Sequence, residues 1–207
     1  MKMINKSCRV MMTVMFLCST VTVIAQGGKG YKETTITPMA GMTIANMTGE
    51  NTDEFGWKPG FTAGIELMHR FNSYLGASLG AFYSQEGTKK KKSVYDAKLS
   101  MDYFNFPVLL NLYVVKGLAL KSGIQLGVLT SCKQSAKEGS YGVTEDLKRE
   151  FEYFDVTLPV GLSFEYSNVV VDARYHFGLK DVKSDGAIYN VMDLKNGFFS
   201  FVLGYRF

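Results

Sequence analysis

Cysteine, histidine and proline are scarce in this chain of 207 residues, which has three, two and four of them. Cys8 and Cys18 fall within the first 25 residues, so the rest of the chain has Cys132 alone. A single cysteine excludes an intrachain disulfide and a cysteine-rich metal site. The two histidines, His69 and His176, are too far apart in the sequence for a metal-binding motif. We therefore expect no metal and no cofactor.

The first 25 residues contain no acidic side chain, and they predict a cleaved signal peptide. Basic residues open the segment, an apolar stretch from Val10 to Ile24 follows, and Ala25 completes a small-residue cleavage pattern. The apolar stretch is too short for a membrane-spanning helix, which needs roughly 20 residues. We expect residues 1–25 to be removed and residues 26–207 to form the exported domain.

The predicted leader also accounts for most of the basic charge. The whole chain has 23 lysines and arginines against 19 acidic residues. Lys2, Lys6 and Arg9 leave with the leader, so the exported part has a net charge of +1. Nucleic-acid-binding proteins carry a basic face. This balance therefore argues against a nucleic-acid partner.

No second long apolar run follows the leader, and apolar residues instead recur at every second position. This alternation predicts β-strands with one apolar face and one face of small or polar residues. The count of such segments is eight. The expected strands lie at or near residues 36–45, 61–71, 74–84, 103–115, 118–128, 154–166, 169–179 and 197–207.

Short and long connections alternate along the chain, which is typical of an up-and-down arrangement. Tight turns are expected at "FNSY", "VKGL" and "YSNV", because Asn, Gly and Ser suit turn conformations. The other connections are long and polar, near residues 46–58, 86–101, 133–152 and 180–196. Within the third of these and the start of the next strand, "EDLKREFEYF" (145–154) predicts a short helix over the barrel mouth. Pro107 and Pro159 fall inside predicted strands, on the polar face, where a local irregularity would be tolerated.

Charged residues of both signs lie on the polar face of the predicted strands, whereas the apolar face carries almost none. Because buried charges need partners, we expect these side chains to pair inside a narrow barrel. The apolar face would then contact lipid, and a closed barrel would satisfy every backbone hydrogen bond. The predicted lumen network consists of Glu66, Lys121, Glu165, Asp172, Arg174 and Arg206.

These features predict an all-β fold, an eight-stranded antiparallel up-and-down transmembrane β-barrel in the outer membrane of a Gram-negative cell. Tight turns would face the periplasm and long loops the exterior. The runs "NFPVLL", "GIQLGVL" and "DARYHFGL", with the final "LGYRF", resemble the PorT-like outer-membrane β-barrel family. That resemblance implies such a barrel and, for the family's best-studied role, assistance to protein secretion. The terminal residues Leu203, Tyr205 and Phe207 resemble the signal that barrel-assembly machinery recognises.

An eight-stranded barrel has room inside only for side chains, which argues against a general porin. We expect a non-enzymatic, monomeric barrel that serves envelope integrity, surface interaction or protein secretion, with outer-membrane lipid, the assembly machinery and a secretion complex or surface ligand as partners. The run Lys89, Lys90, Lys91 and Lys92 could bind an anionic ligand, or simply be a solvated loop.

Two alternatives remain open. One is a lipid-modifying enzyme similar to a lipid A deacylase, using His176. Asp172 lies on the same face as His176, but four residues along a strand at about 3.3 Å each separate them by roughly 13 Å, too far for a catalytic pair. The other alternative is a soluble periplasmic barrel that binds an apolar ligand.

Overall fold

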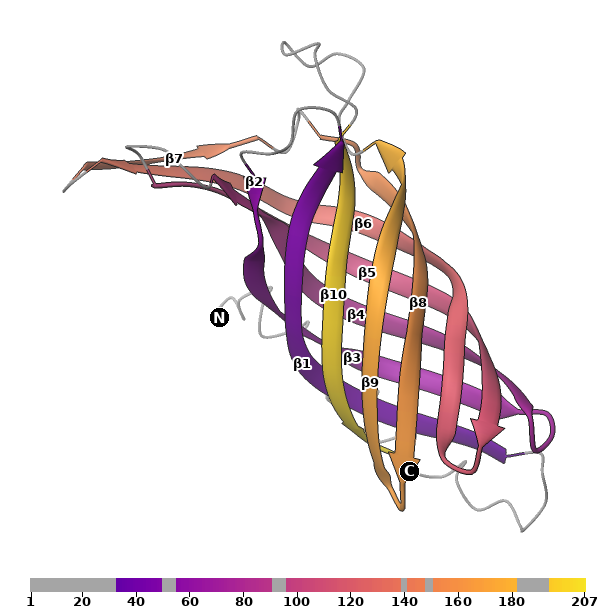
Figure 1. Cartoon of the computed structure of the whole chain (residues 1–207). Helices are drawn as coiled ribbons and strands as arrows, with labels where there is room; N and C mark the ends of the chain where they lie inside the picture. The colour runs from indigo at the N-terminus through magenta and orange to yellow at the C-terminus, as the bar shows by residue number, and fades with distance from the viewer. Residues whose placement is uncertain (1–32, 50–54, 91–95, 139–140, 148–150, 182–193) are drawn as a thin grey trace, which may run out of the picture.

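A computed structural model describes residues 33–49, 55–90, 96–138, 141–147, 151–181 and 194–207. The predicted signal peptide lies outside these residues. Of ten strands, eight form the wall of a barrel (Figure 1). No helix among the described residues is long and apolar enough to cross a membrane. The wall strands are β1 (Glu33–Gly49), β3 (Lys58–Arg70), β4 (Leu75–Lys90), β5 (Asp96–Val115), β6 (Leu118–Glu138), β8 (Phe154–Tyr166), β9 (Val169–Asp181) and β10 (Leu194–Tyr205).

The barrel is closed because its first and last strands pair with each other. Every wall strand pairs antiparallel with its neighbours in the order β1, β3, β4, β5, β6, β8, β9 and β10, and β10 returns to β1. Two short strands lie beyond the wall, where β2 (Phe55–Gly56) pairs with β4 and β7 (Tyr141–Asp146) pairs with β6. The predicted eight-stranded antiparallel barrel is confirmed.

Apolar side chains point outward along the wall, as the alternation predicts. Leu110 and Leu126 are 61% and 53% exposed, whereas Asn111 and Gln125 beside them are only 1% and 3% exposed. Side chains in a strand alternate between its two faces. Once one residue of a strand is known to point outward, the direction of every other side chain in that strand follows. The apolar face of the strands thus forms the outer surface of the barrel, and the polar face lines the lumen.

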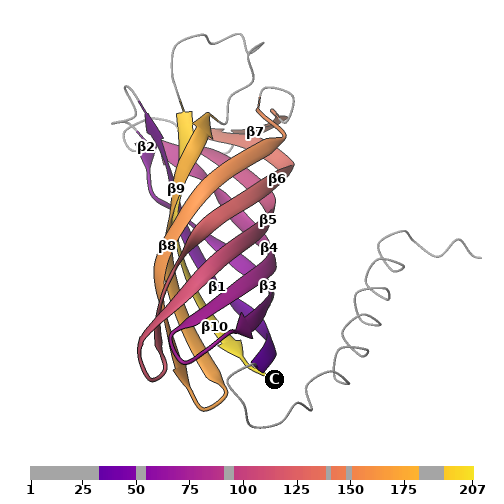
Figure 2. The ribbon, with the colours of Figure 1, turned by 90° about the vertical axis from the view of Figure 1, so that its right-hand side faces the viewer.

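The two ends of the barrel differ. The connections β3–β4, β5–β6 and β8–β9 are the three tight turns predicted, and they lie at the end that also holds the C-terminus (Figure 2). Asn72 stabilises the first of these turns, since its Oδ1 accepts hydrogen bonds from the backbone of Tyr74 and Leu75 at 2.8 and 2.9 Å. Gly117 in the second turn has φ +83°, which glycine adopts without strain. We expect this end to face the periplasm and refer to it as the periplasmic end, and to the other as the outer end.

Pro107 and Pro159 lie in the wall strands β5 and β8, and both point into the lumen. The β4–β5 pairing is interrupted between Leu79↔Val108 and Phe82↔Asn105, next to Pro107. On its other side Pro107 stays in register, opposite Gln125. Because proline has no N–H to donate, it removes ladder bonds on one side only. Pro159 interrupts the β6–β8 pairing in the same way.

At the outer end the strands are longer than predicted. β5 and β6 have 20 and 21 residues, and together with β7 they extend sideways beyond the wall (Figure 1). Much of the sequence expected to form loops near 86–101 and 133–152 is therefore strand. The predicted helix over 145–154 is wrong, because Glu145 and Asp146 belong to β7 and pair with Gln134 and Lys133 of β6. Cross-strand hydrogen bonding has outweighed local helix propensity there.

The outward face gives a stability prediction. Leu110→Arg puts a charge near the middle of the lipid-facing band of β5, which runs from Phe104 to Val114. We expect it to lower the free energy of unfolding in phospholipid vesicles by about 2–4 kcal/mol, because arginine is costly at the midplane. Urea unfolding followed by tryptophan fluorescence measures this change. Tyr166→Arg, at the periplasmic rim, is the control and should cost at most about 1 kcal/mol. Equal effects of both variants would contradict the assignment of the lipid-facing surface.

Candidate functional site

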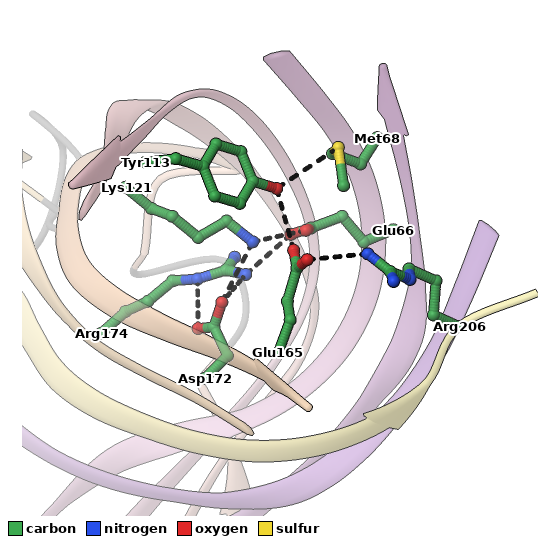
Figure 3. A network of polar contacts seen from close by, with 8 residues as sticks. All are labelled: Glu66, Met68, Tyr113, Lys121, Glu165, Asp172, Arg174 and Arg206. Atoms are coloured by element: carbon green, nitrogen blue, oxygen red, sulfur yellow. Dashed lines mark hydrogen bonds and ion pairs between the residues drawn. The ribbon is translucent and has the colours of Figure 1, made fainter. Parts of the chain in front are cut away.

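Four charged side chains from three strands meet in the middle of the lumen, and we call them the central cluster: Glu66, Lys121, Asp172 and Arg174 (Figure 3). Lys121 Nζ lies 2.5 Å from Glu66 Oε1 and 3.1 Å from Asp172 Oδ2. Arg174 Nη2 lies 2.7 Å from Glu66 Oε2, and its Nε lies 2.6 Å from Asp172 Oδ1. Each carboxylate therefore contacts both cations.

The central cluster is electrically neutral, with two cations and two anions, and each side chain is at most 6% exposed. Removing a charge from water is costly, and the cost is offset only by close, well-oriented opposite charges. Strand alternation points all four side chains inward, and the register places them at one level. The cluster joins β3, β6 and β9 across the lumen with paired charges.

A second group lies at the periplasmic end, and we call it the periplasmic cluster: Arg70, Tyr113, Glu165 and Arg206. Arg206 Nη1 lies 2.7 Å from Glu165 Oε2, and Tyr113 donates its hydroxyl hydrogen to Glu165 Oε1 at 2.9 Å (Figure 3). The Arg70 guanidinium lies 3.7 Å from the centre of the Tyr113 ring, a cation–π contact. The six residues predicted to form one lumen network thus divide into these two groups.

Between the central cluster and the outer end lies a cavity of about 20 Å³, room for a single water molecule. Polar side chains that line it include Thr62, Ser84, Gln125, His176 and Ser200. Two groups of paired charges and this small cavity thus lie along the described part of the lumen. The geometry suits a packed polar interior, as expected for a small barrel.

His176 is buried beside this cavity, on the inner wall. Its Nε2 lies 2.9 Å from Ser200 Oγ, and its ring stacks on Phe198 with centroids 4.0 Å apart. Ser200 is a neighbour on β10 that the sequence did not indicate as a partner. Asp172, the nearest acid on the same strand face, is engaged by Lys121 and Arg174. Nδ1 of His176 has no hydrogen-bond partner among the described residues, so a serine–histidine–acid arrangement is not formed there.

The outer end contains a polar group and an apolar layer that the sequence analysis did not propose as sites. Glu86 of β4 and Asp155 of β8 are buried together with Asn105 and Asn196. Buried apolar residues lie at the same end: Met47, Met101, Tyr103, Leu129 and Cys132. Glu86 continues the polar alternation of β4 beyond Ser84, so a longer window would have indicated it. Asn196 falls in a segment that the sequence predicts to be a loop, because apolar and polar residues do not alternate there.

The remaining predicted residues lie outside the lumen. Leu203, Tyr205 and Phe207 are exposed on the outer wall at the periplasmic end. Lys89 is exposed at the outer end, whereas the side chain of Lys90 and the whole of Lys91 and Lys92 lie outside the described residues. Within the described ranges, no three His, Cys, Asp or Glu side chains gather as metal ligands.

Solved structures share this architecture. The chain is 18% identical to Ail, the attachment invasion locus protein of Yersinia pestis, in a complex with the heparin analogue sucrose octasulfate; the match covers 84% of this chain and 99% of Ail, with a TM-score of 0.50. It is 17% identical to Neisserial surface protein A, covering 83% of this chain and 97% of that one, also with a TM-score of 0.50. At such identities the likeness shows the fold alone.

No curated protein matches the chain. A family model, described as the outer membrane protein beta-barrel domain, matches residues 24–184. This segment includes seven of the eight wall strands and most of the lumen residues described above. With its closed wall, apolar exterior and charge-filled interior, the chain belongs to the outer membrane protein beta-barrel domain family.

Proposed function

We propose that this protein is a non-enzymatic outer-membrane barrel that conducts no solute and works through its outer end. Its role would be envelope integrity and contact with partners at the cell surface. The observation that carries this proposal is the central cluster, which places paired charges across the lumen. A closed lumen leaves the outer wall, which contacts lipid, and the two ends as surfaces for function.

The outer end supports a contact role. β4, β5, β6 and β7 continue beyond the wall as a paired ribbon, and scaffolded extensions of this kind are where binding residues concentrate. Lys89 and Lys98 are directly opposite each other on β4 and β5 and are both exposed. Facing like charges repel, so an anionic surface group would stabilise this pair. We therefore propose that the lysine run contacts an anionic ligand at this pair of facing lysines.

The strand motifs resemble those of the PorT-like family. This resemblance supports a second proposed role, in which the protein contacts a secretion complex and assists protein secretion. Export through a cleaved leader and recognition of Leu203, Tyr205 and Phe207 by the assembly machinery belong to the same proposal. These outward-facing residues lie at the periplasmic end, where a periplasmic machine would reach them. A pull-down of the intact protein in mild detergent identifies the partner.

The neutrality of the central cluster gives a stability prediction. Lys121→Met leaves Glu66 and Asp172 with a single cation, and we expect a loss of about 3–5 kcal/mol in the free energy of unfolding. Adding Glu66→Gln restores charge balance, so the two changes should be non-additive by about 1–3 kcal/mol. Urea unfolding of all three variants measures this coupling. The control is Lys180→Met, which breaks the exposed pair Lys180–Glu152 and should cost at most about 1 kcal/mol. Strict additivity would contradict a coupled cluster.

Closure of the lumen gives an electrical prediction. In planar bilayers under an applied voltage, the wild-type protein should produce no conductance steps above those of the bare membrane. Glu66→Ala with Lys121→Ala shortens two of the four side chains of the central cluster and should allow transient openings. Reproducible steps from the folded wild type would overturn the proposed function.

The enzyme alternative gives a chemical prediction. If His176 has only a structural role, the mass spectrum of lipid A should be the same in cells that carry the wild-type gene, His176→Ala or no gene. The buried position of His176 on the inner wall is the physical reason, since lipid acyl chains contact the outer wall. A change in acylation that requires His176 would establish the enzyme instead.

A further inference from the structure

The acidic pair at the outer end differs from every other buried acid described above. Glu86 and Asp155 are 1% and 4% exposed, yet no ion pair within the described residues joins either carboxylate to a cationic side chain. Lys58 approaches, but its Nζ donates to the main-chain oxygen of Glu86, at 2.9 Å. Glu66, Asp172 and Glu165 all have cationic partners. The pair therefore places two uncompensated carboxylates in an enclosed space.

Two amide side chains bind these carboxylates without neutralising them. Asn105 Nδ2 donates to Glu86 Oε1 at 2.8 Å. Asn196 Nδ2 donates to Glu86 Oε2 and lies 3.4 Å from Asp155 Oδ2, so this amide bridges the two acids. The four side chains come from four different strands, β4, β5, β8 and β10. They bring oxygen atoms from around the barrel to one level of the lumen.

Several oxygens here have no hydrogen-bond partner among the described residues. They are Asp155 Oδ1, Asn196 Oδ1 and Tyr103 Oη, and all three residues are at least nine-tenths buried. Buried polar atoms in native proteins are nearly always satisfied, by protein, water or an ion. Orphaned oxygens next to two uncompensated carboxylates point to a bound cation.

Gly127 lies against this group, and the space around it is tight. A Cβ added there would lie 2.8 Å from Asn105 Oδ1, 3.3 Å from the Tyr103 ring and 3.4 Å from Asp155 Cβ. Glycine at position 127 therefore lets Asn105, Tyr103 and Asp155 lie close together at this level of the lumen. Asn196 can turn its Oδ1 towards the carboxylates by a half-turn of its amide.

We propose that Glu86 and Asp155, with the amide oxygen of Asn196, bind one Ca²⁺ ion at the outer end of the lumen. All available donors are oxygens, which suit a hard cation and not zinc or copper. Donors contributed by three strands, β4, β8 and β10, have an irregular arrangement, which Ca²⁺ tolerates and Mg²⁺ does not. Two carboxylates balance the charge of the ion, which would link these strands beside the apolar layer.

The test uses the protein purified in non-ionic detergent, stripped with EDTA at constant pH, with CaCl₂ as the probe. Extracellular Ca²⁺ sites have dissociation constants of about 10⁻⁴–10⁻³ M, so 10 mM CaCl₂ should raise the folding equilibrium constant about tenfold to a hundredfold. Urea unfolding with CaCl₂ and with EDTA measures the ratio. MgCl₂ at the same concentration should have a smaller effect.

Glu86→Gln with Asp155→Asn keeps the shape of the site and removes its charge, so it should abolish the Ca²⁺ effect. Without calcium, this variant should be more stable than the wild type, because the carboxylates no longer repel each other. Asp155→Asn alone serves if the double variant fails to fold. The matched control is Glu152→Gln, which removes an exposed acid at the same end and should keep the full Ca²⁺ effect.

A direct readout is Tb³⁺ luminescence excited through tyrosine. Tb³⁺ is a hard cation that occupies Ca²⁺ sites, and Tyr103 beside the site should sensitise its emission. Tyr103→Phe should weaken the emission while the Ca²⁺ effect on unfolding persists. An equal Ca²⁺ effect in the wild type and in the double variant would overturn the proposal in favour of surface binding. Absence of any effect in folded wild type would overturn it in favour of a proton shared by the two acids.

Discussion

Lipid offers no hydrogen bonds to the backbone, and this constraint shapes the whole molecule. A sheet placed in a membrane must pair every edge, which a barrel achieves by joining its first strand to its last. Here β1 pairs with β10 from Met39↔Gly204 to Gly49↔Leu194. Pro107 and Pro159 break the ladder on one side each and stay in register on the other, so closure is preserved. Because the chain closes with eight strands, the lumen is narrow.

In a narrow lumen, every second side chain of each strand is buried away from bulk water. Charged side chains among them are therefore costly unless they have partners. The central cluster matches two cations to two anions within 3.1 Å, and in the periplasmic cluster Arg206 pairs with Glu165 at 2.7 Å. The pair Glu86 and Asp155 is not matched in this way, although it is as deeply buried. This difference between layers of the same lumen is the basis for assigning structure to the first two and ion binding to the third.

The narrow, charge-lined lumen is also the reason why we place the proposed function at the outer end of the barrel. Paired charges lie across the described lumen, and His176 is buried against Ser200 and Phe198. By contrast, β5, β6 and β7 continue past the wall as a ribbon that carries exposed lysines. A cation bound beneath this ribbon by Glu86, Asp155 and Asn196 would join β4, β8 and β10 at the outer end of the barrel. Surface contact and stability of the barrel mouth would then depend on the same region.

The sequence by itself determined which face of each strand meets lipid, because a period of two leaves only two choices and charge selects one. Leu110 and Leu126 were therefore placed outward, and Glu66, Lys121, Asp172 and Arg174 inward, from residue order alone. Tertiary structure decided which inward side chains meet, since contacts across a barrel depend on the register between strands far apart in the chain. That is why one predicted network became two clusters, why Ser200 and Asn196 were missed, and why pairing with β6 made a strand where local propensity favoured a helix.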